Sequence, residues 1–130
     1  MSKPLLDIMN LNLNRYGTTF NIESFRETLF EEINEMFDGL ANNDTHEAID
    51  GCMDSIVVLA GLATKLGYNP ELCLKQTVRE ISSRKQQPEQ AAEWQANPKL
   101  VGTTKWLKDT SQPANELYQA DYSTCRLKQK

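Results

Sequence analysis

The feature that most constrains the fold of this chain is an apolar segment, residues 45–66, that carries one narrow acidic stripe. On a helix, which advances by about 100° per residue, the large apolar side chains of this segment face most directions. Its three carboxylates, Glu47, Asp50 and Asp54, then fall within an arc of about 60°. A helix that is apolar on most sides needs partners around it. We therefore expect an all-α fold in which a second copy of the chain helps to cover this helix.

The rest of the chain contains further helical patterns separated by capping and breaking residues. We expect helices over residues 4–16, 22–42, 45–66 and 70–85, with shorter helices near 88–96 and 113–124. Asn21, Asp44 and Asn69 are the expected N-caps, because a side-chain oxygen there can accept from a free N–H of the first turn. The predicted architecture is an antiparallel helical bundle of about four helices, completed by dimerisation. Residues 1–85 would form the helical catalytic core, and residues 86–130 a polar C-terminal extension packing over it within a single domain.

The helix expected at residues 22–42 places acidic side chains beside its apolar face. Glu32 and Glu35 are spaced i, i+3 and project side by side, and Glu31 can join them because it lies i, i+4 from Glu35. Taken alone, a run of glutamates is typical of a solvated helix face. The acidic stripe on the next helix favours a different interpretation, since a carboxylate in an apolar interior carries a large desolvation cost unless a base or a cation faces it.

Few basic residues are available to neutralise these carboxylates. Within the two acidic helices only Arg26 and Lys65 are cationic. We therefore expect a hard divalent cation with oxygen ligands, Mg²⁺ or Mn²⁺, and not zinc, which prefers Cys and His. A structural interpretation stays open for single residues: Glu47 fits a capping box at its helix N-terminus, and Asp54 fits a polar contact at a helix crossing.

Composition argues against several classes of function. The formal net charge of −4 argues against nucleic acid as the main partner. Cys52, Cys73 and Cys125 lack the spacing of a metal or redox motif, so we expect free thiols and a cytoplasmic location. No segment has the pattern of a signal peptide or the length of a membrane span, so we expect no membrane partner. His46 is the only histidine, and Asn43 stands three residues before it, which excludes a di-iron carboxylate bundle.

Cationic and aromatic residues suited to contact a substrate lie further along the chain. Lys85 continues the inward line of the helix expected at residues 70–85, and Arg84 is beside it. A metal cluster that faces cations is the arrangement used in phosphoryl chemistry, because both offset charge on the reacting oxygens. Trp94 or Trp106 could stack on a base, although each also fits a lid or packing residue. Lys85 also fits an ordinary helix-end lysine.

The acidic spacing resembles that of the MazG-like family of all-α nucleoside triphosphate pyrophosphohydrolases. The family carries an Exx(E) pair on one helix and an Exx(D) pair on the next, which read here as Glu32-Ile33-Asn34-Glu35 and Glu47-Ala48-Ile49-Asp50. With the following stretch, EAIDGCMDSIVVLAGLATKLGYNP, these motifs are similar to the small phage-encoded branch, over roughly residues 20–85. In an alternative register, Asp54 takes the place of the motif's aspartate, and Gly51 stands where a glutamate belongs.

The resemblance implies a homodimer or dimer of dimers that converts a (deoxy)nucleoside triphosphate to the monophosphate and pyrophosphate, in the host cytoplasm if the protein is phage-encoded. It implies that Mg²⁺ is held by Glu32, Glu35, Glu47 and Asp50. Asp54 would add a further ligand or orient a water molecule, and Glu31 would activate that water. The segment Ser82-Ser83-Arg84-Lys85 resembles the family's Asn-x-x-Lys phosphate contact, with Ser82 in place of Asn.

Two other functions stay open. A non-catalytic helical interaction protein would bind a host factor through its acidic surface and would release no pyrophosphate. A metal-buffering or regulatory bundle would bind Mg²⁺ without turnover.

Overall fold

The computed structural model describes residues 3–128, and no strand forms within this range. The α-helices are α1 (Pro4–Tyr16), α2 (Ile22–Ala41), α3 (Thr45–Lys65), α4 (Pro70–Ser82) and α5 (Pro88–Ala96). Short 3-10 helices follow: η1 (Pro98–Leu100), η2 (Ala114–Glu116) and η3 (Tyr122–Cys125). The predicted all-α class is confirmed, while the bundle of about four helices and its completion by a second copy stay proposals. Among the described residues, none of these helices has the length and apolar character that a membrane span requires.

The helices begin where the sequence places capping side chains. Asn21 Oδ1 accepts a hydrogen bond from Ser24 N–H at 3.0 Å, and Asp44 Oδ1 accepts one from Glu47 N–H at 3.1 Å. Asn69 Oδ1 likewise accepts from two N–H groups in the first turn of α4. All three predicted N-caps are confirmed, because each depends only on residues within one turn of the helix.

The helices in the second half of the chain are partly shorter than predicted. α4 ends at Ser82, before the end expected at Arg84 or Lys85. The Lys85 N–H group donates to Gln112 Oε1 at 2.8 Å, so a distant side chain accepts the hydrogen bond that a continuing helix would direct to the Ile81 carbonyl. The α5 helix at 88–96 is confirmed, but residues 113–124 form only η2 and part of η3 instead of one helix.

The chain divides into two compact units. Unit 1 consists of the described residues of Met1–Cys73 and Tyr122–Lys130, and unit 2 consists of Leu74–Asp121. The division falls inside α4, and the predicted catalytic core of residues 1–85 with its C-terminal extension of residues 86–130 stays a prediction. The last described residues therefore belong to the same unit as α1, α2 and α3.

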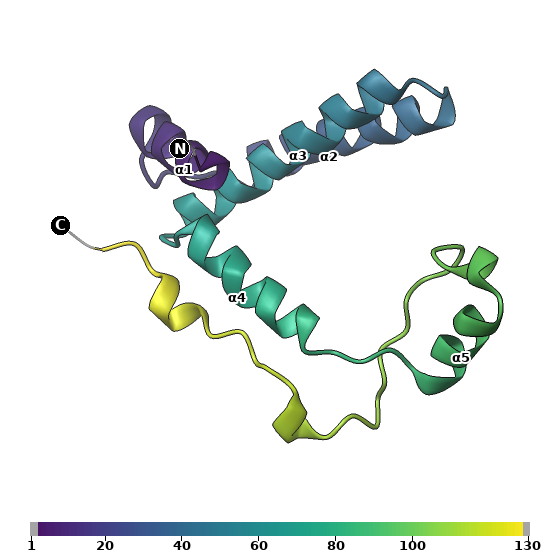
Figure 1. Cartoon of the computed structure of the whole chain (residues 1–130). Coiled ribbons are helices and arrows are strands. Elements are labelled where there is room, and N and C mark those ends of the chain that lie inside the picture. The colour runs from purple at the N-terminus through teal and green to yellow at the C-terminus, as the bar shows by residue number, and fades with distance from the viewer. Residues whose placement is uncertain (1–2, 129–130) are drawn as a thin grey trace. The chain divides into compact units, whose positions relative to one another are not determined.

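In unit 1, α2 and α3 lie side by side and antiparallel, joined by a turn at residues 42–44 (Figure 1). Small residues allow the helices to approach closely. A Cβ atom added at Gly39 would clash with the backbone of Ala48. Where α1 packs against α3, a Cβ atom at Gly61 would lie 2.8 Å from Asn12 Oδ1. The packing of unit 1 thus depends on glycines at the helix contacts.

The large apolar side chains of α2 and α3 are only partly covered within one chain. Phe37 is 58% exposed, Ile49 56% and Leu59 48%. Within the single chain only α1 and α2 pack extensively against α3, so the covering of this helix by a second copy stays a prediction. The buried positions of α3 are small residues: Ala48, Gly51, Ser55, Ala60, Gly61 and Thr64.

The C-terminal segment of unit 1 pairs with the residues that precede α4. Asn69 N–H donates to the Cys125 carbonyl at 2.8 Å, and Leu127 N–H donates to the Gly67 carbonyl at 2.8 Å. Burial, together with the neighbouring Cys125 thiol, raises the pKa of Cys73 to about 11, so this thiol stays protonated at neutral pH. Among the described residues, Cys52, Cys73 and Cys125 form no disulfide and keep their thiols, as predicted.

Unit 2 is held together mainly by side chains that bond to backbone groups. Gln90 of α5, 6% exposed, donates to the Lys105 carbonyl at 2.9 Å and accepts from Leu107 N–H at 2.8 Å. The segment that leads to residue 121 runs beside α4 (Figure 1). There the Arg79 guanidinium stacks on the Tyr118 ring, with 3.8 Å between Cζ and the ring centroid.

Candidate functional site

Gly51 sets the register of the α2–α3 hairpin. A Cβ atom added there would lie 2.6 Å from Met36 N and 2.8 Å from Glu32 O, closer than a carbon atom can approach. Since the two helices run antiparallel, residues that follow Gly51 on α3 face residues that precede Met36 on α2. Asp54 thereby comes level with Glu32.

Three carboxylates meet at this level of the hairpin. One carboxylate oxygen each from Glu32, Glu35 and Asp54 lie within 4.8 Å of one another. Glu32 and Glu35 come from successive turns of α2, as the i, i+3 spacing predicts, and Asp54 comes from α3. Glu32 and Asp54 are half-buried, whereas Glu35 is exposed. We refer to these three residues as the carboxylate cluster.

Glu32 is the residue of the cluster whose electrostatics are most strongly perturbed. Burial, and after it the negative charges of Glu35 and Asp54, together raise its pKa from the ordinary value of 4.5 to about 7. Glu32 Oε2 is buried and has no hydrogen-bond partner. When all three carboxylates are ionised, none of them can donate a hydrogen bond, whereas a proton on Glu32 can be donated to Glu35 or Asp54.

The residues of the cluster fit a divalent cation. No ion pair between residues of the range 3–128 reaches them, and the pairs Arg84–Glu80 and Lys85–Glu116 lie elsewhere in the chain. All the atoms that the cluster offers to a metal are carboxylate oxygens, the ligands that Mg²⁺ and Mn²⁺ prefer. A cation would also satisfy the buried Oε2 of Glu32, which no protein group does. The cluster does not by itself select Mg²⁺ over another hard cation.

The remaining acidic residues expected at the site lie outside the cluster. Glu47 is half-buried in the first turn of α3, where its N–H group is capped by Asp44. Asp50 is exposed, and it precedes Gly51, so it lies nearer the turn of the hairpin than Asp54 does. Glu31 is exposed on α2. The structure therefore brings Asp54 to Glu32 and Glu35, the pairing of the alternative register of the sequence motif.

The predicted substrate-contacting cations lie in unit 2 and bind acidic side chains there. Arg84 Nη2 pairs with Glu80 Oε2 at 3.3 Å, and Lys85 Nζ pairs with Glu116 Oε1 at 2.8 Å. The hydrogen bond and charge of Glu116 raise the pKa of Lys85. Sequence reasoning missed both partners. The i, i+4 spacing of Glu80 and Arg84 could have revealed the first, but Glu116 is 31 residues from Lys85. Ser82 is the last residue of α4.

The two tryptophans differ in their surroundings. Trp106 is 42% exposed. Trp94 is half-buried and lines a cavity of about 450 Å³ together with Leu100 and Leu107. Stacking of a base on either ring stays a prediction.

Comparison of the chain with protein-family models, with curated proteins and with solved structures finds no match. The MazG-like resemblance of the acidic motifs therefore stays a prediction, and the function has to be inferred from the residues of the site.

Proposed function

We propose that this protein binds a divalent cation at Glu32, Glu35 and Asp54 and hydrolyses a nucleoside triphosphate to the monophosphate and pyrophosphate. The observation that carries the proposal is the buried Oε2 of Glu32, an oxygen without a protein partner that belongs to a cluster of three carboxylates. The reaction itself is supported by the resemblance of the acidic motifs to those of the MazG-like pyrophosphohydrolases.

The residues of the cluster would have different roles. A bound Mg²⁺ would offset charge on the phosphate oxygens and polarise a water molecule. Glu32, because it is the most desolvated, loses its proton near pH 7 and would then be the ligand that most needs the cation. Asp54 would hold the cation from α3, and the exposed Glu35 would hold it on the solvent side. Glu31, on the same helix and exposed, would accept the proton of the attacking water.

We also propose that two copies of the chain associate through the exposed apolar faces of α2 and α3. Side chains such as Phe37, Ile49 and Leu59 are about half exposed within one chain, which is unusual for residues on two long packed helices. Burial of these side chains against a second hairpin would produce the bundle of about four helices that the sequence predicts. Analytical ultracentrifugation tests this, and a monomer at micromolar concentration would contradict it.

Pyrophosphate release from a panel of nucleoside and deoxynucleoside triphosphates tests the enzymatic proposal. We expect turnover that requires Mg²⁺ or Mn²⁺ and stops in EDTA. Glu35→Gln and Asp54→Asn should each lower kcat at least about 100-fold, because each removes a ligand charge at the reacting centre. Asp38→Asn is the matched control, since Asp38 is an exposed acid on α2 outside the cluster. Equal activity of the cluster variants and wild type would refute the site.

Metal binding distinguishes the two registers of the motif. Mn²⁺ titration followed by electron paramagnetic resonance should show weaker binding for Asp54→Asn than for Asp50→Asn or Glu47→Gln. The reverse order would show that Glu47 and Asp50 are ligands and that the carboxylate cluster is not the main site. Metal binding without any turnover would favour a metal-buffering bundle. The absence of both would favour the non-catalytic interaction protein.

A further inference from the structure

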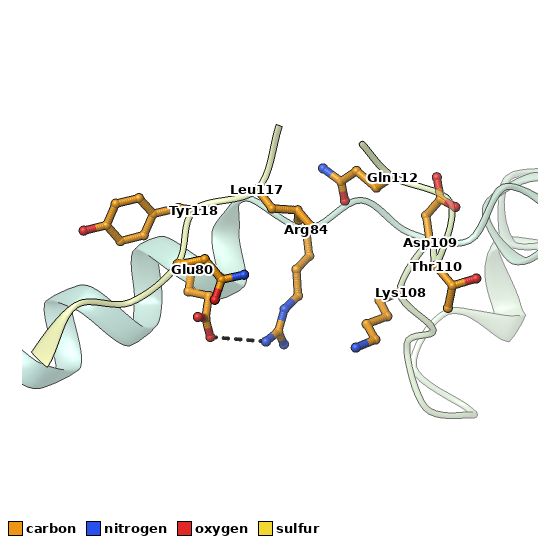
Figure 2. Close-up of a pocket in the computed structure, with 9 residues that line it drawn as sticks. Glu80, Arg84, Lys108, Asp109, Thr110, Gln112, Leu117 and Tyr118 are labelled. Atoms are coloured by element: carbon orange, nitrogen blue, oxygen red, sulfur yellow. Dashed lines mark hydrogen bonds and ion pairs between the residues drawn. The ribbon is translucent and has the colours of Figure 1, made fainter. Parts of the chain in front are cut away.

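A second candidate site lies wholly within unit 2, at a cavity of about 450 Å³ between the end of α4 and the loop of residues 108–112 (Figure 2). The loop is fixed to the end of α4. Gln112 Oε1 accepts from Lys85 N–H at 2.8 Å, and Gln112 Nε2 donates to the Ser83 carbonyl at 2.9 Å. Asp109 N–H donates to the Lys85 carbonyl at 2.8 Å. Hydrogen bonds to the backbone therefore hold the walls of the cavity in place.

Two cationic side chains reach this cavity. Figure 2 shows the Arg84 guanidinium and the Lys108 ammonium on the same side of the cavity. The carboxylate of Glu80 is already engaged, because Oε2 pairs with Arg84 at 3.3 Å and Oε1 accepts from Ala120 N–H at 3.0 Å. Lys108 has no ion-pair partner among the residues that the structure describes. Two positive charges thus share one carboxylate.

The other acid at the cavity does not neutralise Lys108. Asp109 accepts hydrogen bonds from the Ser111 hydroxyl at 2.7 Å and from Ser111 N–H at 2.9 Å, which lower the pKa of Asp109. Figure 2 shows its carboxylate on the opposite side of the loop from the Lys108 ammonium. Residues 74–121 also hold half of the chain's 14 basic residues but only a third of its 18 acidic residues, so unit 2 as a whole favours an anionic ligand.

We propose that this cavity binds a phosphate group between Arg84 and Lys108, carried by inorganic phosphate or by a phosphate ester. The guanidinium fork of arginine matches two oxygens of a phosphate, and lysine adds a point charge. Thr110, which also lines the cavity, supplies a hydroxyl donor. The site differs from the phosphate contact that the sequence motif predicts at Lys85, whose ammonium binds Glu116. It does not depend on the carboxylate cluster or on turnover.

Isothermal titration calorimetry of the 130-residue chain with inorganic phosphate, in EDTA, tests the site. Wild type should show saturable binding, and Lys108→Ala should weaken it about tenfold, because a charged donor is lost. Lys108→Arg keeps the charge and should retain binding. Lys99→Ala is the matched control, since it removes the same charge from an exposed position of unit 2 outside the cavity, and it should change Kd less than about twofold.

Glu80→Gln provides a test of the opposite sign. The amide oxygen can still accept from Ala120 N–H, but the charge that competes for Arg84 is removed, so phosphate should bind more tightly. A nucleoside monophosphate that displaces phosphate, and whose binding also depends on Lys108, identifies a phosphate ester as the ligand. Binding of inorganic phosphate alone identifies the free anion.

Three results would overturn the proposal: no saturable phosphate binding by wild type, Lys108→Ala binding like wild type, or Lys99→Ala weakening binding as much as Lys108→Ala. Thermal unfolding followed by circular dichroism confirms that each variant is folded.

Discussion

Glu32→Gln should change how the stability of the metal-free protein depends on pH. Folding raises the pKa of Glu32 from 4.5 to about 7, first through burial and then through the charges of Glu35 and Asp54. Between these two values the folded state binds more protons than the unfolded state, so this group makes stability fall as the pH rises from 4.5 to 7. Above pH 7 the loss is complete. Glutamine has nearly the same shape and no charge, so the stability of the variant does not fall in this way as the pH rises.

The size of the effect follows from the pKa difference. At 1.36 kcal/mol per pKa unit, the shift from 4.5 to about 7 sets an upper limit of about 3.4 kcal/mol. Glu35 is exposed, so water and salt screen part of the repulsion, and we expect on the order of 2 kcal/mol. The free energy of unfolding of Glu32→Gln, relative to wild type, should therefore rise by this amount between pH 4.5 and pH 8.

Urea unfolding followed by circular dichroism, in EDTA at several pH values, measures this difference. Glu31→Gln is the matched control, because Glu31 is the preceding residue on α2, is exposed and lies outside the carboxylate cluster. The difference in free energy of unfolding between Glu31→Gln and wild type should not change with pH in the same way. Added Mg²⁺ at pH 8 should stabilise wild type more than Glu32→Gln, since a ligand stabilises only the state that binds it. A Glu32→Gln difference that is independent of pH, or that shrinks as the pH rises, would refute the reasoning.

Three further predictions concern packing and assembly. Gly51→Ala should destabilise the protein by about 2 kcal/mol, because crowding the α2 backbone costs about 3 kcal/mol and the gain in helix propensity is only about 1 kcal/mol. Unchanged urea unfolding and unchanged Mn²⁺ affinity would contradict this. Gln90→Ala should lower the free energy of unfolding by about 2 kcal/mol, because the Leu107 N–H and Lys105 carbonyl groups lose their hydrogen-bond partner. Limited proteolysis should then cut residues 97–107 faster than in wild type, and equal cleavage rates would argue against the prediction. Phe37→Glu should shift sedimentation towards the monomer and leave the fold of the single chain intact, since the Phe37 side chain is 58% exposed within one chain. An unchanged dimer would place the subunit contact elsewhere.

The sequence by itself determined the helices of unit 1 and the pairing of side chains within one helix. Asn21 and Asp44 cap α2 and α3 where expected, because capping acts between residues only three positions apart. Glu32 and Glu35 lie together for the same reason, since three residues return the chain to nearly the same face of a helix. The all-α class followed from these local rules alone.

Only the tertiary structure decided which acid of α3 meets those of α2. The spacing on α3 allowed Asp50 as well as Asp54, and the contact of Gly51 with Met36 sets the antiparallel register that brings Asp54 to Glu32. The partner of Lys85 and the early end of α4 were likewise beyond local reasoning, because both depend on a segment about 30 residues further along the chain. Such contacts depend on how whole elements pack, and no periodicity within one helix encodes them.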